Sequence, residues 1–133
     1  MTKKKKNEPI YTLNIFHFYD EKIKKNGVLF LVQTTKIFVS FQYEILLEDQ
    51  LEGQNIILKI AGLHVPELLM PATGPARGWR HYNNLIGTYN LKIIKQDKTE
   101  NDFLLEITSS NVQIKRKPPR PFILISNEPV EFY

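Results

Sequence analysis

The stretch LIGTYNLKIIKQDKTENDFLLEITSSNVQIKR, residues 85–116, decides the fold class. Apolar and polar residues alternate in three short runs, and polar turn sequences separate the runs. A two-residue period is that of a β-strand with one buried face, so the stretch predicts a meander of three strands. The residues that share a face are Tyr89, Leu91 and Ile93 in the first run, Phe103, Leu105 and Ile107 in the second, and Val112, Ile114 and Arg116 in the third.

The sequence before this meander predicts further strands at residues 11–19, 28–32, 37–45 and 56–60. The first is apolar on both faces, which predicts either a bulge near Ile15 or burial on both sides. In the third, the predicted buried face consists of Ile37, Val39, Phe41, Tyr43 and Ile45. Residues 48–53 are acidic and are predicted to form a turn.

After the meander, KPPRP (residues 117–121) is too rich in proline for a central strand and predicts an extended connection. Short strands are predicted at residues 122–126 and 130–132. About eight or nine short strands predict an all-β protein, an antiparallel β-sandwich with one long loop and possibly one short helix. A small closed β-barrel is the alternative. Residues 28–32 and 122–125 look apolar on both sides, which favours the sandwich.

The length of 133 residues is that of one domain, so we expect a single β domain over residues 8–133 after a disordered basic tail at 1–7. The net charge of +4 comes from the lysine run at residues 3–6, and the rest of the chain is neutral. Cysteine is absent, which excludes thiol catalysis and zinc fingers. No apolar run suggests a signal peptide or a membrane span, so a soluble, cytoplasmic protein without membrane contact is expected.

The segment LHVPELLMPATGPARGWRHYNNLIG, residues 63–87, is predicted to be the long loop. Pro66 could begin a short helix, but Pro71, Gly74, Pro75 and Gly78 break regular structure further on. This segment contains the only tryptophan, and its arginines, which present a fixed fork of hydrogen-bond donors, are close in sequence to aromatic residues. The candidate ligand-binding residues are Arg77, Trp79, Arg80, His81 and Tyr82.

These residues predict a non-catalytic module that uses the 63–87 loop to bind a protein partner or a small anionic ligand. The opposing interpretation is a structural lid over one end of the sandwich, anchored by Trp79. Binding of single-stranded nucleic acid is an alternative function, because aromatic and basic residues occur together. An enzyme with an unrecognised site is another, and it requires His64, His81 and a carboxylate to converge. No catalytic motif, cofactor fingerprint or metal-ligand spacing is present in the sequence, so no catalytic residue, cofactor or metal is assigned, and the oligomeric state is left open.

Overall fold

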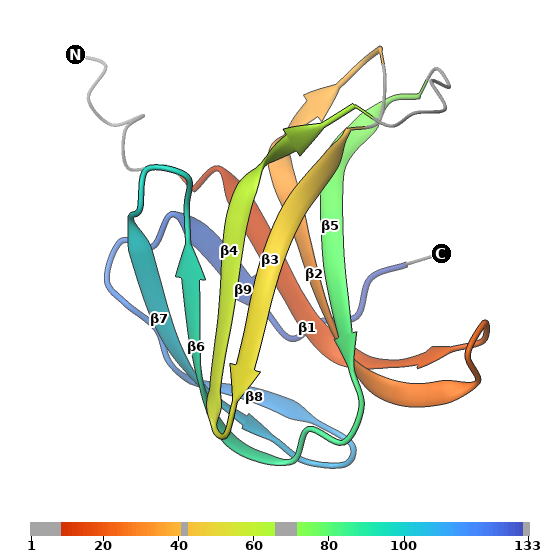
Figure 1. Cartoon of the computed structure of the whole chain (residues 1–133), viewed down its shortest axis with the longest axis vertical. Coiled ribbons are helices and arrows are strands. Elements are labelled where there is room, and N and C mark those ends of the chain that lie inside the picture. Colours follow the sequence, from red (N-terminus) through yellow and green to blue (C-terminus); the bar gives the residue numbers. More distant parts are fainter. Residues whose placement is uncertain (1–8, 41–42, 66–71, 132–133) are drawn as a thin grey trace.

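The computed structural model describes residues 9–40, 43–65 and 72–131, and this part of the chain contains nine β-strands and no helix (Figure 1). The strands are β1 (Tyr11–Asp20), β2 (Lys25–Phe38), β3 (Glu44–Glu52), β4 (Asn55–His64), β5 (Gly74–Tyr82), β6 (Gly87–Ile94), β7 (Glu100–Ile107), β8 (Val112–Arg116) and β9 (Ile123–Ser126). The all-β prediction is therefore confirmed.

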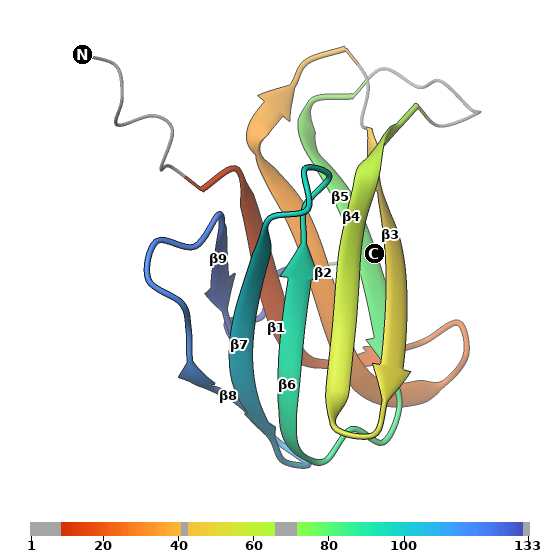
Figure 2. The same ribbon diagram turned by 60° about the vertical axis from the view of Figure 1, so that its left-hand side comes forward.

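All nine strands belong to one sheet in the order β8-β7-β6-β4-β3-β5-β2-β1-β9. The sheet is mixed: five neighbouring pairs are antiparallel, whereas β1–β9, β3–β5 and β4–β6 are parallel. It curls until its two end strands come close, as the view in Figure 2 shows. This nearly closed barrel is compatible with the barrel that the sequence left open.

Side chains close the gap between the two ends of the sheet. The Asn127 amide donates to the carbonyl oxygen of Val112 at 2.7 Å, and the carbonyl of the buried Asn101 side chain accepts from the Phe122 N–H at 2.8 Å. Both bonds tie the segment around β9 to β7 and β8, without a backbone ladder between β8 and β9. The proline-rich segment of residues 117–121 is a connection without strand structure, as the sequence predicted, but it bends at residues 119–120, where Arg120 has φ of 55°, so it is not extended throughout.

The main core fills the inside of the curled sheet, and the inward residues of β4, β6 and β7 are those that the period-2 pattern predicts. Phe30, Leu58, Leu91 and Leu105 are fully buried there. Burial of such side chains is the main stabilising contribution to folding, at about 25 cal/mol per Å² of apolar surface. The predicted inward faces of residues 56–60, 89–93 and 103–107 are all buried.

A second, smaller cluster lies on the outer face of β1 and β2 and consists of Phe16, Leu29 and Leu31, with Phe18 and Val130 packed against it. The pairing of β1 with β2 runs through Ile15 without a register shift. Of the two predictions for this strand, burial on both sides is therefore confirmed, and the bulge near Ile15 is wrong.

The predicted strand at residues 37–45 is wrong. β2 ends at Phe38 and β3 begins at Glu44, and the side chains of Ile37 and Val39 are 53% and 76% exposed. Phe41 lies outside the described residues. The acidic turn predicted at 48–53 is also wrong, because β3 continues to Glu52 and the turn follows at residues 53–54. Charged residues are compatible with a strand whose exposed face meets water.

The prediction that residues 63–87 form one loop is wrong for the part that contains the candidate site residues, because residues 74–82 are β5. Pro75 lies at the register shift of the β2–β5 pair, and the next N–H, that of Ala76, bonds to the Thr34 hydroxyl at 2.9 Å. Proline is tolerated at such irregular positions and at strand starts. The short helix predicted from Pro66 falls on residues 66–71, outside the described residues, as does the basic tail. No strand forms at residues 130–131.

Candidate functional site

The five predicted site residues all lie on β5, and strand geometry divides them between its two faces. Arg77, Trp79 and His81 are on the outer face, opposite Gln33, Leu31 and Leu29 of β2. Arg80 and Tyr82 are on the other face, and the Tyr82 ring packs edge-on against Phe30 of the core with 5.5 Å between ring centroids. Alternation of side chains across a strand therefore separates residues that are adjacent in the sequence.

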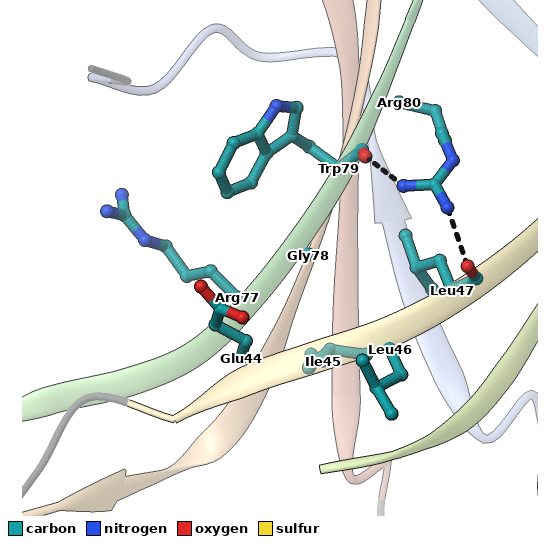
Figure 3. Close-up of a pocket in the computed structure, with 8 residues that line it drawn as sticks. All are labelled: Glu44, Ile45, Leu46, Leu47, Arg77, Gly78, Trp79 and Arg80. Carbon is teal, nitrogen blue, oxygen red and sulfur yellow. Dashed lines mark hydrogen bonds between the residues drawn. The ribbon is translucent and has the colours of Figure 1, made fainter. Parts of the chain in front are cut away.

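The junction between β3 and β5 is where the sheet opens. The two strands share one bridge, Glu44 with Arg77, next to which the Arg77 N–H donates to the carbonyl oxygen of Tyr43 at 3.3 Å. Gly78 follows, and a Cβ there would meet the carbonyl oxygen of Ile45. Beyond Gly78 the strands diverge (Figure 3). A glycine in a strand often marks such a close approach of two backbones.

The guanidinium group of Arg80 spans the opened part of the junction (Figure 3). Its Nη2 donates to the carbonyl oxygen of Leu47 on β3 at 2.6 Å, and its Nη1 donates to the carbonyl oxygen of Trp79 on β5 at 2.8 Å. Its Nε pairs with the carboxylate of Asp49 at 2.7 Å. Arginine presents its donors in a fixed fork, so one side chain satisfies two carbonyl groups that a regular ladder would otherwise satisfy.

Asp49 also accepts a hydrogen bond from the Tyr82 hydroxyl, which completes a three-residue cluster. Burial by itself raises the pKa of Asp49, but the hydrogen bonds from Tyr82 and Arg80 and the charge of Arg80 outweigh it, so the pKa lies below its ordinary value. Burial and the neighbouring Asp49 carboxylate raise the pKa of Tyr82 far above its ordinary value. Asp49 is thus held ionised and Tyr82 is held neutral.

Replacing Tyr82 with phenylalanine is expected to lower the free energy of unfolding by about 1 to 2 kcal/mol at pH 7, because it removes a hydrogen bond to a charged group and keeps the ring. The contribution of Asp49 is present above about pH 4 and is lost as pH falls through its lowered pKa. The contribution of Tyr82 is present below about pH 10 and is lost as pH rises towards its raised pKa. Urea unfolding measured across pH should therefore show that the free energy of unfolding falls less steeply at acidic and at alkaline pH in Tyr82→Phe than in the wild type.

Tyr19→Phe is the matched control for this measurement, since the Tyr19 side chain is 47% exposed at the end of β1. It should leave the free energy of unfolding and its pH dependence unchanged. Equal pH profiles for Tyr82→Phe and the wild type would contradict the assigned role of the Asp49–Tyr82 bond.

A pocket of about 340 Å³ lies across the β3–β5 junction, open to solvent on one side (Figure 3). Trp79 and Leu46 contribute exposed apolar surface, with 43% and 44% of their side chains accessible. Charged groups flank them, with Glu44 and Arg77 at one end and Arg80 at the other. The residues that line this pocket, called here the β3–β5 groove, are Glu44, Ile45, Leu46, Leu47, Arg77, Gly78, Trp79 and Arg80.

Three of the five predicted residues, Arg77, Trp79 and Arg80, line the β3–β5 groove, whereas His81 and Tyr82 do not. The His81 Nε2 lies 3.0 Å from the carbonyl oxygen of Phe18, and the two rings pack edge-on with their centroids 6.1 Å apart. His81 thus connects β5 to β1.

The sequence prediction missed the contribution of β3. Glu44 was assigned to the preceding strand at residues 37–45 and Asp49 to the turn at residues 48–53, and Leu46 was assigned to neither. The alternation of Ile45, Leu47 and Asp49 could have placed Asp49 on the inner face of an unbroken strand. Its acidic neighbours favoured the turn.

The histidines do not converge. His64 Nδ1 lies 3.4 Å from the carboxylate of Glu44 at one end of β4, and His81 contacts β1 instead. Within residues 9–40, 43–65 and 72–131, no group of three or more His, Asp or Glu side chains could hold a metal ion. The convergence of His64, His81 and a carboxylate that the enzyme alternative requires is therefore missing from the described part of the chain.

No protein-family model matches this chain, and neither a curated protein nor a solved structure is significantly similar to it. No helix able to cross a membrane occurs in the described residues.

Proposed function

We propose that this protein is a non-catalytic binding module whose β3–β5 groove takes an extended segment of a partner protein. The observation that supports the proposal is the composition of the groove. Trp79 on β5 and Leu46 on β3 expose apolar surface on opposite sides of the groove, and charged and backbone polar groups lie between and beside them. Protein interfaces combine apolar anchors with a polar rim in this way, and tryptophan and arginine dominate their binding energy.

A small anion fits the groove less well than a protein segment does. The Arg80 donors are engaged by Asp49 and by two backbone carbonyl groups. Arg77 is the bridge partner of the acidic Glu44, which reduces the positive potential at that end. A small anion would therefore depend on one cation, Arg77, whose charge Glu44 partly offsets, and it would gain nothing from the apolar surface of the groove. Apolar side chains of a partner segment could cover Trp79 and Leu46, and acidic side chains of the same segment could still face Arg77.

The two alternative functions receive less support. For single-stranded nucleic acid, the ring of Tyr82, one of the aromatic candidate residues, packs against the core and does not line the groove. For an enzyme, the required histidines lie apart. The cytoplasmic location inferred from the sequence stays a prediction.

The test is selection of binders from a random peptide library displayed on phage, with the full chain as bait. Synthetic versions of the selected peptides should bind the wild type in fluorescence anisotropy. Trp79→Ala should weaken the affinity for these peptides at least tenfold, because truncation of a tryptophan anchor typically removes a large share of the binding energy. Leu46→Ala, on the opposite side of the groove, should also weaken the affinity for these peptides.

Tyr19→Ala is the matched control, since Tyr19 is an aromatic residue with an exposed fraction close to that of Trp79 and lies outside the groove. It should leave the affinity unchanged. The proposal would be refuted if no peptide is selected, or if the selected peptides bind Trp79→Ala and Leu46→Ala with the same affinity as the wild type. If no peptide binds, but calorimetry detects binding of sulfate or citrate and Arg77→Ala abolishes that binding, the small-anion function would replace the proposed one.

A further inference from the structure

The chain covers part of its own outer surface with residues 127–131, which we call the C-terminal strap. After β9 these residues run without regular structure across the face of β1 and β2 that is turned away from the core (Figure 1). Val130 packs on Phe16, Leu29 and Leu31, the floor beneath the strap, and these three side chains are at most 4% exposed.

Side chains, rather than strand pairing, hold the strap. The Asn14 amide donates to the carbonyl oxygen of Glu128 at 3.0 Å, and the Asn127 amide donates to the carbonyl oxygen of Val112 at 2.7 Å. The Glu128 N–H donates to the Ser126 hydroxyl oxygen at 3.0 Å. Segments with few buried apolar contacts open at a small fraction of the global free energy of unfolding. One partly buried valine and a few side-chain hydrogen bonds make the strap such a segment.

The strap and the surface under it are complementary in charge. The strap carries Glu128 and Glu131. The strap packs on β1 and β2, and β5 is the next strand of the sheet. The outward positions of these three strands include two basic residues, Lys25 and Arg77, and one acidic residue, Asp20, which is the register partner of Lys25 at the β1–β2 turn. The other outward residues named here are not acidic: Thr12, Asn14, Phe16 and Phe18 on β1, Leu29, Leu31 and Gln33 on β2, and Trp79 and His81 on β5. Such a surface favours an acidic segment over a basic one.

The floor also adjoins the β3–β5 groove. Leu31 in the floor is the register partner of Trp79, which lines the groove. A segment that displaced the strap could therefore continue from the floor onto Trp79. The outer face of β1, β2 and β5 and the groove form one surface.

We infer that the C-terminal strap is an internal competitor, and that the partner segment is of the same chemical class, an extended acidic segment with an apolar side chain between its acidic residues. This inference deepens the proposed function and rests on it, since it names the class of segment. A ligand that needs the strap-free state binds with an apparent affinity reduced by the fraction of molecules in that state. Loosening the strap raises that fraction.

The test uses the fluorescein-labelled peptide SNEPVEFY, the sequence of residues 126–133, as the probe for the full chain. Val130→Ser removes the apolar contact of the strap and should raise the affinity for the peptide at least tenfold over the wild type. Asn127→Ala releases the start of the strap without altering the floor and should act in the same direction. A charge-reversed peptide, SNKPVKFY, should bind at least tenfold more weakly than SNEPVEFY.

Val65→Ser is the matched control, because Val65 is 48% exposed and follows directly after β4, away from the floor. It should leave the affinity at the wild-type value. Equal peptide affinity in the wild type, Val130→Ser and Asn127→Ala, or equal binding of the charge-reversed peptide, would overturn the inference. That result would leave the proposed function standing if library peptides still depend on Trp79, so the two failures are distinguishable.

Discussion

Replacing Gly78 with alanine is expected to lower the free energy of unfolding by about 2 to 3 kcal/mol, as measured by urea denaturation. A Cβ at this position would collide with the carbonyl oxygen of Ile45 and would lie 3.1 Å from the Cβ of Ile45. The obstacle is mainly backbone of a paired strand, so it cannot rotate away as a side chain could. The usual gain of alanine over glycine in a strand, about 0.5 to 1 kcal/mol, is too small to offset this collision.

Gly53→Asn is the comparison for this variant. Gly53 lies in the β3–β4 turn with φ of 57°, and a Cβ there would meet nothing within 4 Å. Asparagine tolerates this left-handed conformation better than other residues with a side chain, so the loss should stay below about 1 kcal/mol. If Gly78→Ala proved as stable as Gly53→Asn, β3 and β5 would not be in close contact at this point.

Replacing Asn101 with leucine is expected to cost about 1 to 3 kcal/mol of unfolding free energy, because it leaves a buried N–H without an acceptor. Asn101 is the buried polar residue among the described residues, with 7% of its surface exposed. Its side-chain carbonyl accepts from the Phe122 N–H at 2.8 Å, and its amide donates to the carbonyl oxygen of Glu100 at 3.0 Å. Leucine has a similar volume, so the loss reports the hydrogen bonds rather than a cavity.

Asn90→Leu is the control, since Asn90 lies on the exposed face of β6. The same substitution there should change the free energy of unfolding by less than about 0.5 kcal/mol. Thermal melting of both variants beside the wild type gives the comparison. Equal melting temperatures for the two variants would show that the Asn101–Phe122 bond does not hold β9 against β7.

The strands of the meander could be predicted because their pattern is local. Each inward residue from Tyr89 to Ile107 follows a two-residue period, and burial of one face is enough to select the strand conformation. The same rule failed at residues 37–45, where the alternation continues through Ile37 and Val39 although the sheet does not cover these positions. A period identifies a face that could be buried, and neighbouring strands decide whether it is.

The candidate site could be predicted only in part. Clustered charge and aromatic content singled out Arg77, Trp79 and Arg80, which do line the β3–β5 groove. Glycine and proline were interpreted as loop formers, because nothing local shows that Pro75 lies at a register shift or that Gly78 faces another backbone. The partners on β3 lie about 30 positions away in the sequence, as the Arg80–Asp49 bond illustrates.

The sequence by itself determined the all-β class, the inward faces of β4, β6 and β7, and the segment that contributes the tryptophan and arginines of the groove. These properties depend on local periodicity and on residue chemistry. Only the tertiary structure decided that this segment is a strand, that its five candidate residues divide between two faces, and that Asp49 and Leu46 join them. The physical reason is that pairing of β5 with β2 and β3 fixes its backbone hydrogen bonds, and those long-range bonds outweigh the local preference of glycine and proline for turns.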